Sequence, residues 1–183
     1  MLPAPAAPRL EYVREPDVSE RLDRELCALI SGCFTAPEDA FLKHQRWVRE
    51  MPLHRYLLRD EHGCLVAHAA VHEKRIGVGD GELLVGGMAE VCVLESQRGR
   101  GHVRRLLEAA HAGMLERGIR FALLMGDSRV YSSSGYRPVD EPVRRLDHRT
   151  QTIEFGRMTH VLYKPLTEEP WPAGPVDLRG PLF

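Results

Sequence analysis

The sequence has no long apolar run, few cysteines and almost no net charge, and each absence argues against a class of protein. No apolar stretch approaches the ~18 residues that a membrane-spanning helix requires, so no membrane role is expected. The net charge of −1 argues against a nucleic-acid-binding protein, because duplex binding usually shows as a basic excess over the whole domain. The four cysteines include no Cys-x-x-Cys pair, which favours buried free thiols in a reducing cytoplasm.

The first residues also lack the features of a targeting segment. Residues 1–8 are rich in proline and alanine, and no charged segment precedes an apolar one as in a secretory signal. We therefore expect a loose tail over residues 1–8 and a cytoplasmic location. The 43% hydrophobic and 28% charged residues are typical of an ordinary globular protein, and we expect a single domain over residues 1–183.

Three segments have the apolar spacing of helices. Apolar residues recur every three or four positions over Leu22–Cys33, after a capping region at Asp17–Ser19. A second, shorter helix is predicted over Pro37–Glu50, because proline suits a first helical turn. The clearest helix covers Val103–Met114 and is closed by Gly118.

The remaining apolar segments are typical of strands, and together they predict an α+β fold with a mixed and mostly antiparallel central sheet flanked by helices. The predicted strands are Tyr56–Arg59, Cys64–Ile76, Glu82–Leu94, Phe121–Met125, Arg144–Asp147 and Met158–Lys164. Gly86 and Gly87 interrupt the third of them and favour a bulge or a close approach of the backbone. The final stretch, residues 168–183, is rich in proline and glycine and is expected to form a surface tail.

The loop ahead of the clearest helix is the candidate ligand site. Residues 97–103 are Gln-Arg-Gly-Arg-Gly-His-Val, and the glycines allow the backbone to turn so that several N–H groups point outward together. These groups and the positive end of the helix dipole would bind a diphosphate. Arg104 and Arg105 either contact such phosphates or form a solvated helix face. The alternative is an ordinary tight turn, and neither the P-loop nor the Rossmann glycine pattern is present.

Two motifs resemble those of the GNAT acetyltransferase superfamily. Residues Arg98–Gly101 are similar to the acyl-CoA loop between the fourth strand and third helix of that family, with Val103 where the family usually has a small residue. Residues 124–136, which end in Tyr131–Tyr136, resemble its fifth strand and fourth helix. The resemblance implies a GNAT-like domain with a V-shaped splay between the fourth and fifth strands.

The resemblance also implies an activity. It points to an acyl-CoA-dependent N-acyltransferase (EC 2.3.1.-) that moves an acetyl or other acyl group directly from CoA to a primary amine. Further similarities, among them Val66–Val71 and Trp171–Gly174, are with the aminoglycoside 2'-N-acetyltransferases and the nodulation N-acyltransferases. They suggest a small-molecule amine as acceptor, such as an amino sugar or an aminoglycoside. Transfer to a protein amine, a noncatalytic acyl-CoA-binding sensor and a homodimer stay open.

The resemblance assigns roles to individual residues. Backbone groups of Val91 and Val93, freed by a bulge or splay near Gly87–Glu90, are expected to pair with the pantetheine arm and to place an N–H near the thioester oxygen. The set expected to bind acetyl-CoA or another acyl-CoA is Val91, Cys92, Val93, Arg98, Gly99, Arg100, Gly101, His102 and Val103. Tyr131 stands where the family commonly has the proton donor to the leaving thiolate, and the alternative is a tyrosine packed in the core.

Other side chains near these motifs have structural alternatives. Glu90 is the candidate base, acting through water, and the alternative is an ordinary surface or strand-end carboxylate. Asp127 is explained by helix capping. Cys92 is interpreted as a small buried residue, because no His and Asn arrangement supports a covalent acyl-enzyme. No metal is expected, because His68 and His72 are four apart on a predicted strand and too distant to chelate one ion easily.

Overall fold

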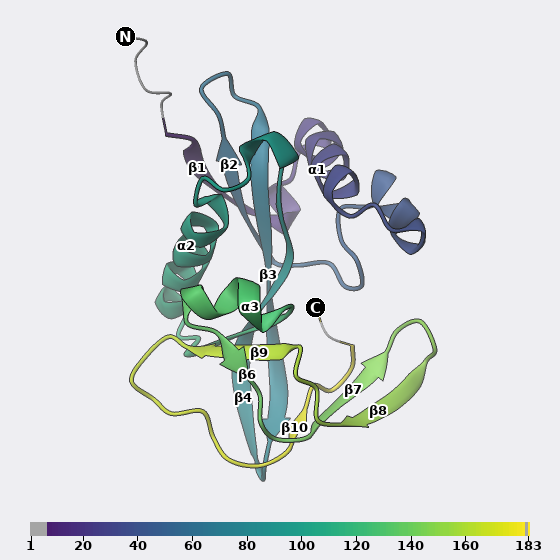
Figure 1. The fold of residues 1–183 in the computed structure, drawn as a ribbon, viewed down its shortest axis with the longest axis vertical. Helices are drawn as coiled ribbons and strands as arrows, with labels where there is room; N and C mark the ends of the chain where they lie inside the picture. The colour runs from purple at the N-terminus through teal and green to yellow at the C-terminus, as the bar shows by residue number, and fades with distance from the viewer. Residues whose placement is uncertain (1–6, 182) are drawn as a thin grey trace. The chain divides into compact units, whose positions relative to one another are not determined.

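The computed structural model describes residues 7–181 and residue 183, and Figure 1 shows their fold. The described chain divides into two compact units. The first unit comprises Met1–Ala70 and Glu90–Ala110, and the second comprises Val71–Ala89 and His111–Phe183. Most of the expected N-terminal tail, residues 1–6, lies outside the described residues. Strands β3 (Leu65–Val78) and β4 (Gly81–Val93) each run from one unit into the other.

The first unit contains an amphipathic helix that its sequence pattern predicts correctly. Helix α1 (Glu20–Cys33) follows the 3₁₀ turn η1 (Glu15–Asp17), and the Ser19 side chain caps it by accepting a hydrogen bond from the Leu22 amide at 3.2 Å. The apolar face of α1 belongs to a buried cluster. The buried members of this cluster are Leu22, Leu26, Leu29, Ile30, Leu42, Leu57, Leu65 and Cys92.

The strands of the first unit include one that the sequence pattern does not reveal. Strand β1 (Arg9–Arg14) pairs antiparallel with β2 (His54–Arg59) along its whole length, and β2 also pairs with β3. None of the six residues of β1 is fully buried, and Leu10 and Tyr12 are exposed, so its apolar residues do not mark a core-facing side. At the end of β4, the Leu94 amide donates to the Val66 carbonyl at 2.9 Å.

The second unit contains a sheet with the strand order β6-β9-β5-β4-β3-β10-β7-β8. Its further strands are β5 (Phe121–Met125), β6 (Arg137–Pro138), β7 (Val143–Asp147), β8 (Thr152–Gly156), β9 (Val161–Pro165) and β10 (Val176–Asp177). The parallel pairing of β4 with β5 runs from Gly86 opposite Ala122 to Met88 opposite Leu124. Strand β9 pairs antiparallel with β5, and β8 pairs antiparallel with β7. The described chain is therefore α+β with a mixed, mostly antiparallel sheet, as predicted.

Of the other two predicted helices, the one after the glycine loop is confirmed and the one that begins at Pro37 is shorter than predicted. Helix α2 (His102–Glu116) confirms the clearest predicted helix, and Gly118 follows it with a φ of +77°. The other helical elements are η2 (Pro37–Lys43), η3 (Glu95–Gln97), α3 (Ser128–Tyr131) and η4 (Ser132–Ser134). The prediction of a helix over Pro37–Glu50 is wrong beyond Lys43. Side chains take the backbone carbonyls there, since Arg55 donates to Arg46 O and Gln45 donates to Trp47 O.

The C-terminal segment corrects a second expectation. Residues 168–183 are not simply a surface tail, because β10 pairs with both β3 and β7 and buries Val176 and Leu178 to 1% exposure each. The Trp171 ring also packs against Tyr163, with 4.6 Å between ring centroids. A two-residue strand between prolines is too short to show a periodic pattern, so only the tertiary pairing reveals it.

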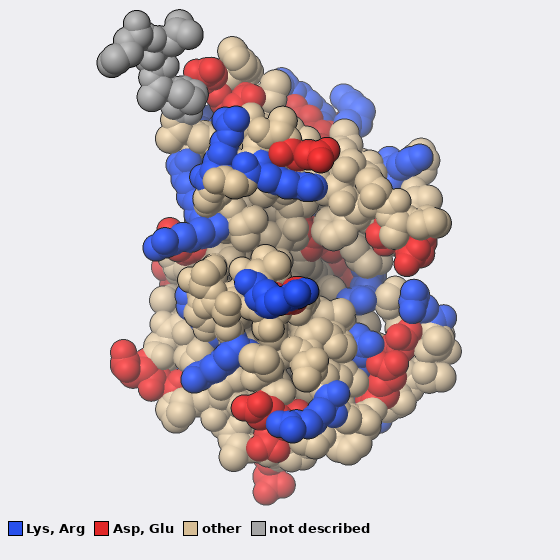
Figure 2. All heavy atoms as spheres, viewed as in Figure 1, with Lys and Arg blue, Asp and Glu red and all other residues tan. Residues whose placement is uncertain are grey.

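The described residues form no helix that is both long and apolar enough to cross a membrane. On the face shown in Figure 2, basic and acidic side chains are interspersed, and neither sign forms a continuous patch. Several charged side chains of the second unit form ion pairs, such as Arg129 with Asp127 and Arg120 with Glu169. Charge on this face is therefore balanced locally as well as in total.

We expect Gly86→Ala to destabilise the protein by about 1 to 3 kcal/mol, the usual cost of overpacking a core. A Cβ at Gly86 would lie 2.5 Å from the sulfur of Met114, which is fully buried, so the Met114 side chain would have to move. Gly32→Ala in α1 is the control, because a Cβ there meets nothing within 4 Å and a helical alanine gains about 0.5 to 1 kcal/mol. Urea unfolding of both variants measures the difference, and equal effects would contradict this packing.

Candidate active site

The loop that precedes α2 depends on two glycines in a left-handed conformation. After η3, Gly99 has a φ of +74° and Gly101 a φ of +77°, values that residues with a Cβ rarely adopt. A Cβ at either position would meet nothing within 4 Å, so the backbone conformation and not crowding requires glycine. The predicted turn at Arg98–Gly101 is therefore present.

The first amides of α2 have no helical partner. The first i to i−4 bond of the helix runs from the Arg105 amide to the Gly101 carbonyl at 3.1 Å. By helix geometry, the amides of His102, Val103 and Arg104 precede this bond. Gly101 stands at the N-cap position and has no side chain that could cap them. The start of α2 is thus a set of N–H donors suited to an anion.

The arginines around this loop are engaged to different extents. Arg105 donates to the Pro8 carbonyl, and Arg104 pairs with Glu108 at 2.8 Å on the exposed side of α2. Arg98 donates to the Val93 carbonyl at 3.4 Å, and Arg100 donates to the Ser96 carbonyl at 3.4 Å on the exposed surface. The last two bonds are long and therefore weak, so Arg98 and Arg100 are the arginines that can most easily turn to a ligand.

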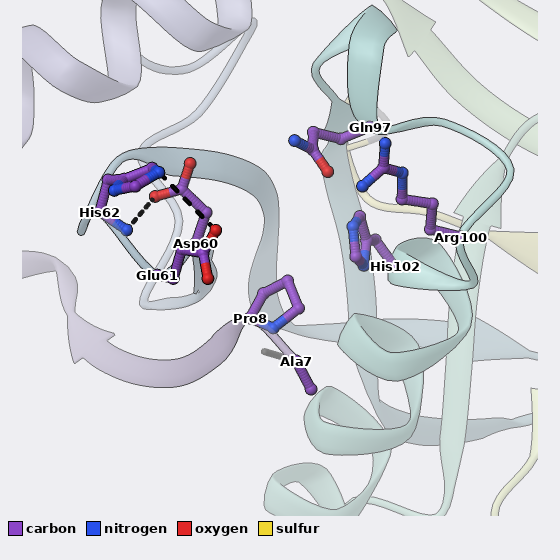
Figure 3. A pocket seen from close by; sticks show the side chains of 8 residues that line it. All are labelled: Ala7, Pro8, Asp60, Glu61, His62, Gln97, Arg100 and His102. Carbon is purple, nitrogen blue, oxygen red and sulfur yellow. Dashed lines mark hydrogen bonds and ion pairs between the residues drawn. The ribbon is translucent and has the colours of Figure 1, made fainter. Parts of the chain in front are cut away.

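A cavity of about 380 Å³ adjoins the loop (Figure 3). Gln97, Arg100 and His102 line one side of it, and the turn between β2 and β3 lines the other. In that turn, Asp60 accepts hydrogen bonds from the amides of His62 and Cys64. His102 is 7% exposed, and burial together with Arg100 and Arg105 lowers its pKa. His102, the first residue of α2, therefore places a buried imidazole beside the glycine loop.

At the end of β4, the backbone N–H and C=O groups of successive residues point alternately toward β3 and away from it. Because the Leu94 amide donates to Val66 on β3, the alternation of a strand directs the backbone groups of Val91 and Val93 to the opposite edge. The Val93 carbonyl accepts from the Arg98 guanidinium and, at 3.4 Å, from the Cys33 thiol. The predicted pantetheine-binding residues thus present backbone groups away from β3.

Cys92 is buried beside a second thiol that the sequence does not associate with it. Interaction with the Cys92 thiol, helped by Arg98, lowers the pKa of Cys33. Interaction with Cys33 and burial raise the pKa of Cys92. Cys92 is 5% exposed and belongs to the apolar cluster under α1. Its place is that of a buried core residue.

Glu90 is the most unusual residue of β4. Its φ is +42°, a left-handed value that is strained for a residue with a side chain, and it distorts β4 near the predicted position. Its side chain is 6% exposed, so the interpretation as a surface carboxylate is wrong. Oε1 accepts from the Val48 amide at 3.1 Å, and Oε2 has no hydrogen-bond partner within the described part of the chain. Burial raises the pKa of Glu90 to about 7, the range that suits a general base.

Tyr131 ends α3 in the second unit. Its side chain is half-buried, and its ring meets the Tyr136 ring edge-on, with 6.0 Å between centroids. Tyr136 is in turn hydrogen-bonded to His111 at 2.7 Å, and burial raises its pKa. Asp127 caps α3 by accepting from the Arg129 amide, as predicted. Tyr131 thus packs against the hydrogen-bonded Tyr136 ring, and its own side chain is not buried in the core.

The family of the protein is shown by its sequence. A family model described as an acetyltransferase (GNAT) domain matches residues 18–139. The chain belongs to the GNAT family of acetyltransferases. The match covers β4, the loop before α2 and Tyr131, which are the parts of the chain that carry the candidate site. A comparison with curated proteins gives no match.

Solved GNAT structures share the fold of this chain at low sequence identity. YhbS from Escherichia coli, solved in complex with CoA, is similar with a TM-score of 0.70 and 19% identity over 97% of this chain and 92% of that one. A GNAT acetyltransferase from Brucella melitensis, solved with acetyl-CoA, has a TM-score of 0.57 and 16% identity over 92% and 94% of the two chains. One from Staphylococcus aureus Mu50 has a TM-score of 0.54, 12% identity and coverages of 87% and 100%.

The buried polar residues around Glu90 in this GNAT chain are not evident from its sequence pattern. Arg55 and His68 are both 0% exposed, and Glu15 is 4% exposed. Their signal in the sequence is weak but real, because His68 interrupts a strand of apolar residues and Arg55 directly precedes another. A polar side chain in such a strand must find a buried partner. No group of three or more potential metal ligands occurs among residues 7–181 and 183.

Glu90→Gln is expected to stabilise the protein at neutral pH. The raised pKa of about 7, against the ordinary 4.5, means that the folded state holds a proton more tightly than the unfolded state. The wild-type protein therefore keeps its full stability below pH 4.5 and loses on the order of 2 to 3 kcal/mol as the pH rises to 7. Glutamine stays neutral, so the advantage of the variant should grow over this interval.

Thermal unfolding between pH 4 and 8 measures this difference. Glu116→Gln is the control for the lost charge, because it removes an exposed carboxylate at the end of α2. A constant offset between wild type and Glu90→Gln across the range would show that the Glu90 carboxyl titrates like an exposed one.

Proposed function

We propose that this GNAT chain transfers an acetyl group from acetyl-CoA to a primary amine of a small molecule. The observation that carries the proposal is the start of α2, where three amides follow an N-cap without a side chain and two left-handed glycines shape the loop. These donors fit a diphosphate, and two similar structures were solved with CoA and with acetyl-CoA. Residues 91–93 and 98–103 would hold the cofactor.

Glu90 is proposed as the base. Acetyl-CoA supplies the acyl group as a thioester, and transfer forms a C–N bond while the C–S bond breaks. The amine loses a proton as it attacks, and Oε2 of Glu90, which is buried and lacks a partner in the described chain, accepts that proton through a water molecule. An N–H of the Val91–Val93 segment would stabilise the carbonyl oxygen.

Tyr131 is proposed as the acid. The leaving thiolate needs a proton, and the phenol of Tyr131 would donate it in the transition state. The acceptor is proposed to be an amino sugar or an aminoglycoside, on the similarity of Val66–Val71 and Trp171–Gly174 to transferases that acylate such amines. A protein amine is the competing acceptor, and a panel of both kinds of amine with acetyl-CoA distinguishes them by the thiol released.

We expect Gly101→Ala to weaken CoA binding by about tenfold, because an alanine at a φ of +77° is strained by roughly 1 to 2 kcal/mol and the loop will move to relieve the strain. Gly118→Ala is a matched control. Gly118 has the same φ of +77° at the other end of α2, and a Cβ there also meets nothing within 4 Å. Isothermal titration with CoA measures both. Equal CoA affinity of the two variants would show that the loop is not part of the CoA-binding site.

Glu90→Gln should lower kcat/KM for the acceptor by about a hundredfold, the usual contribution of a general base, without changing CoA affinity. Tyr131→Phe should slow transfer by about tenfold or more and also leave CoA affinity intact. The control for Tyr131→Phe is Tyr163→Phe, which removes a phenol hydroxyl elsewhere in the second unit and should leave the rate unchanged. If every variant binds CoA and none changes the rate of thiol release, the two residues have no part in the chemistry.

A further inference from the structure

Arg55 is a buried guanidinium whose three nitrogen atoms all have partners. Nε donates to the Glu15 carboxylate, Nη1 lies 3.0 Å from Nε2 of His68, and Nη2 donates to the Arg46 carbonyl at 3.2 Å. The side chain is 0% exposed, so each lost bond would leave a charged group unsatisfied out of water. These three contacts therefore fix the orientation of the guanidinium.

The contact with Arg55 decides the tautomer of His68. A guanidinium can only donate, so Nε2 of His68 must accept and cannot carry a proton. Burial and the nearby Arg55 charge lower the pKa of His68, which keeps the ring neutral. The one ring proton is then on Nδ1, which donates to the Glu90 carbonyl at 3.0 Å. Arg55 thus directs a hydrogen bond, through His68, to the backbone of the strained residue.

A second route connects Arg55 with the carboxylate of Glu90. Arg55 holds the Arg46 carbonyl, and Arg46 is itself anchored by Glu15 at 2.7 Å and by Asp23 at 2.6 Å. Two residues later, the Val48 amide donates to Oε1 of Glu90 at 3.1 Å. The loop over residues 46–48 therefore provides the hydrogen bond to Oε1, and Oε2 is the oxygen without a partner in the described chain.

We propose that Arg55 and His68 are positioning residues that hold Glu90 by its carbonyl and by its carboxylate, so that Oε2 points to the acceptor amine. This inference rests on the proposed function, in which Glu90 is the base. It adds that the base is oriented from outside β4, by residues of β2 and β3 that touch neither the amine nor the cofactor. Among the described residues, the charged or titratable groups of Glu15, Arg49 and Cys92 also interact electrostatically with Glu90.

The matched variants His68→Asn and His68→Gln test the direction of the hydrogen bond. The amide nitrogen of asparagine takes the place of Nδ1, so His68→Asn keeps a donor for the Glu90 carbonyl. The amide of glutamine takes the place of Nε2, so His68→Gln keeps a partner for Arg55 and loses that donor. A merely structural role for His68 would make the two variants behave alike.

The first readout is the titration of the Glu90 carboxyl by carbon NMR, assigned with Glu90→Gln. In His68→Gln the strained backbone at Glu90 relaxes and water reaches its carboxyl, so the pKa of Glu90 should fall toward the ordinary value by about one unit or more. In His68→Asn the pKa should stay within about half a unit of the wild-type value. Equal titration of Glu90 in both variants would overturn the proposal.

The second readout is acetyl transfer from acetyl-CoA to kanamycin. His68→Gln should lower kcat by about tenfold and leave the KM for acetyl-CoA unchanged, and His68→Asn should restore most of the rate. On a Glu90→Gln background, His68→Gln should cost no further rate, because it acts through Glu90. A full additional loss in the double variant would mean that His68 acts elsewhere.

A third measurement covers the case in which the variants fail to fold or kanamycin is inert. In the wild-type protein labelled with ¹⁵N-histidine, His68 should be neutral from pH 6 to about 9 with its proton on Nδ1. A proton on Nε2 would overturn the proposal directly. If the tautomer and the Glu90 titration agree with expectation while Glu90→Gln has normal activity, the positioning stands and the proposed catalytic role of Glu90 fails.

Discussion

The first unit of this GNAT chain depends on the buried guanidinium of Arg55. A charge that is removed from water is tolerated only if every donor is satisfied, so the carboxylate of Glu15, the ring of His68 and the carbonyl of Arg46 must be present together. The same contacts reach Glu90, whose left-handed backbone would otherwise be costly. The hydrogen bonds that satisfy the buried charges therefore also hold the strained backbone of the candidate base.

The proposed site uses two physical strategies in neighbouring segments. At the start of α2, recognition relies on backbone amides, which Gly101 leaves uncapped, while Arg104 and Arg105 have partners of their own. At Glu90, chemistry relies on a side chain that burial has made basic. Backbone recognition tolerates changes of side chain, and buried side-chain chemistry does not. This difference explains why the cofactor loop was easier to read from the sequence than the surroundings of the base.

Tyr131 illustrates a third kind of constraint. Gly126 has no side chain, and a Cβ there would lie 2.6 Å from the Tyr131 ring, so the glycine makes room for the ring beside the end of β5. Tyr136 meets that ring from another side and is held by His111. The position of the phenol is thus set by a small residue and a buried hydrogen bond, neither of which takes part in the proposed reaction.

The sequence by itself determined the α+β fold, helices α1 and α2, strand β5 and the glycine loop, because these features depend on local periodicity and on the conformational freedom of glycine. It also contained both motifs that resemble the GNAT family. Only the tertiary structure decided that Glu90 is buried, that His68 donates to its carbonyl and that Val176 and Leu178 are in the core. Those facts rest on partners far apart in the chain, such as Arg55 and Glu15, and on two-residue pairings that leave no periodic signal.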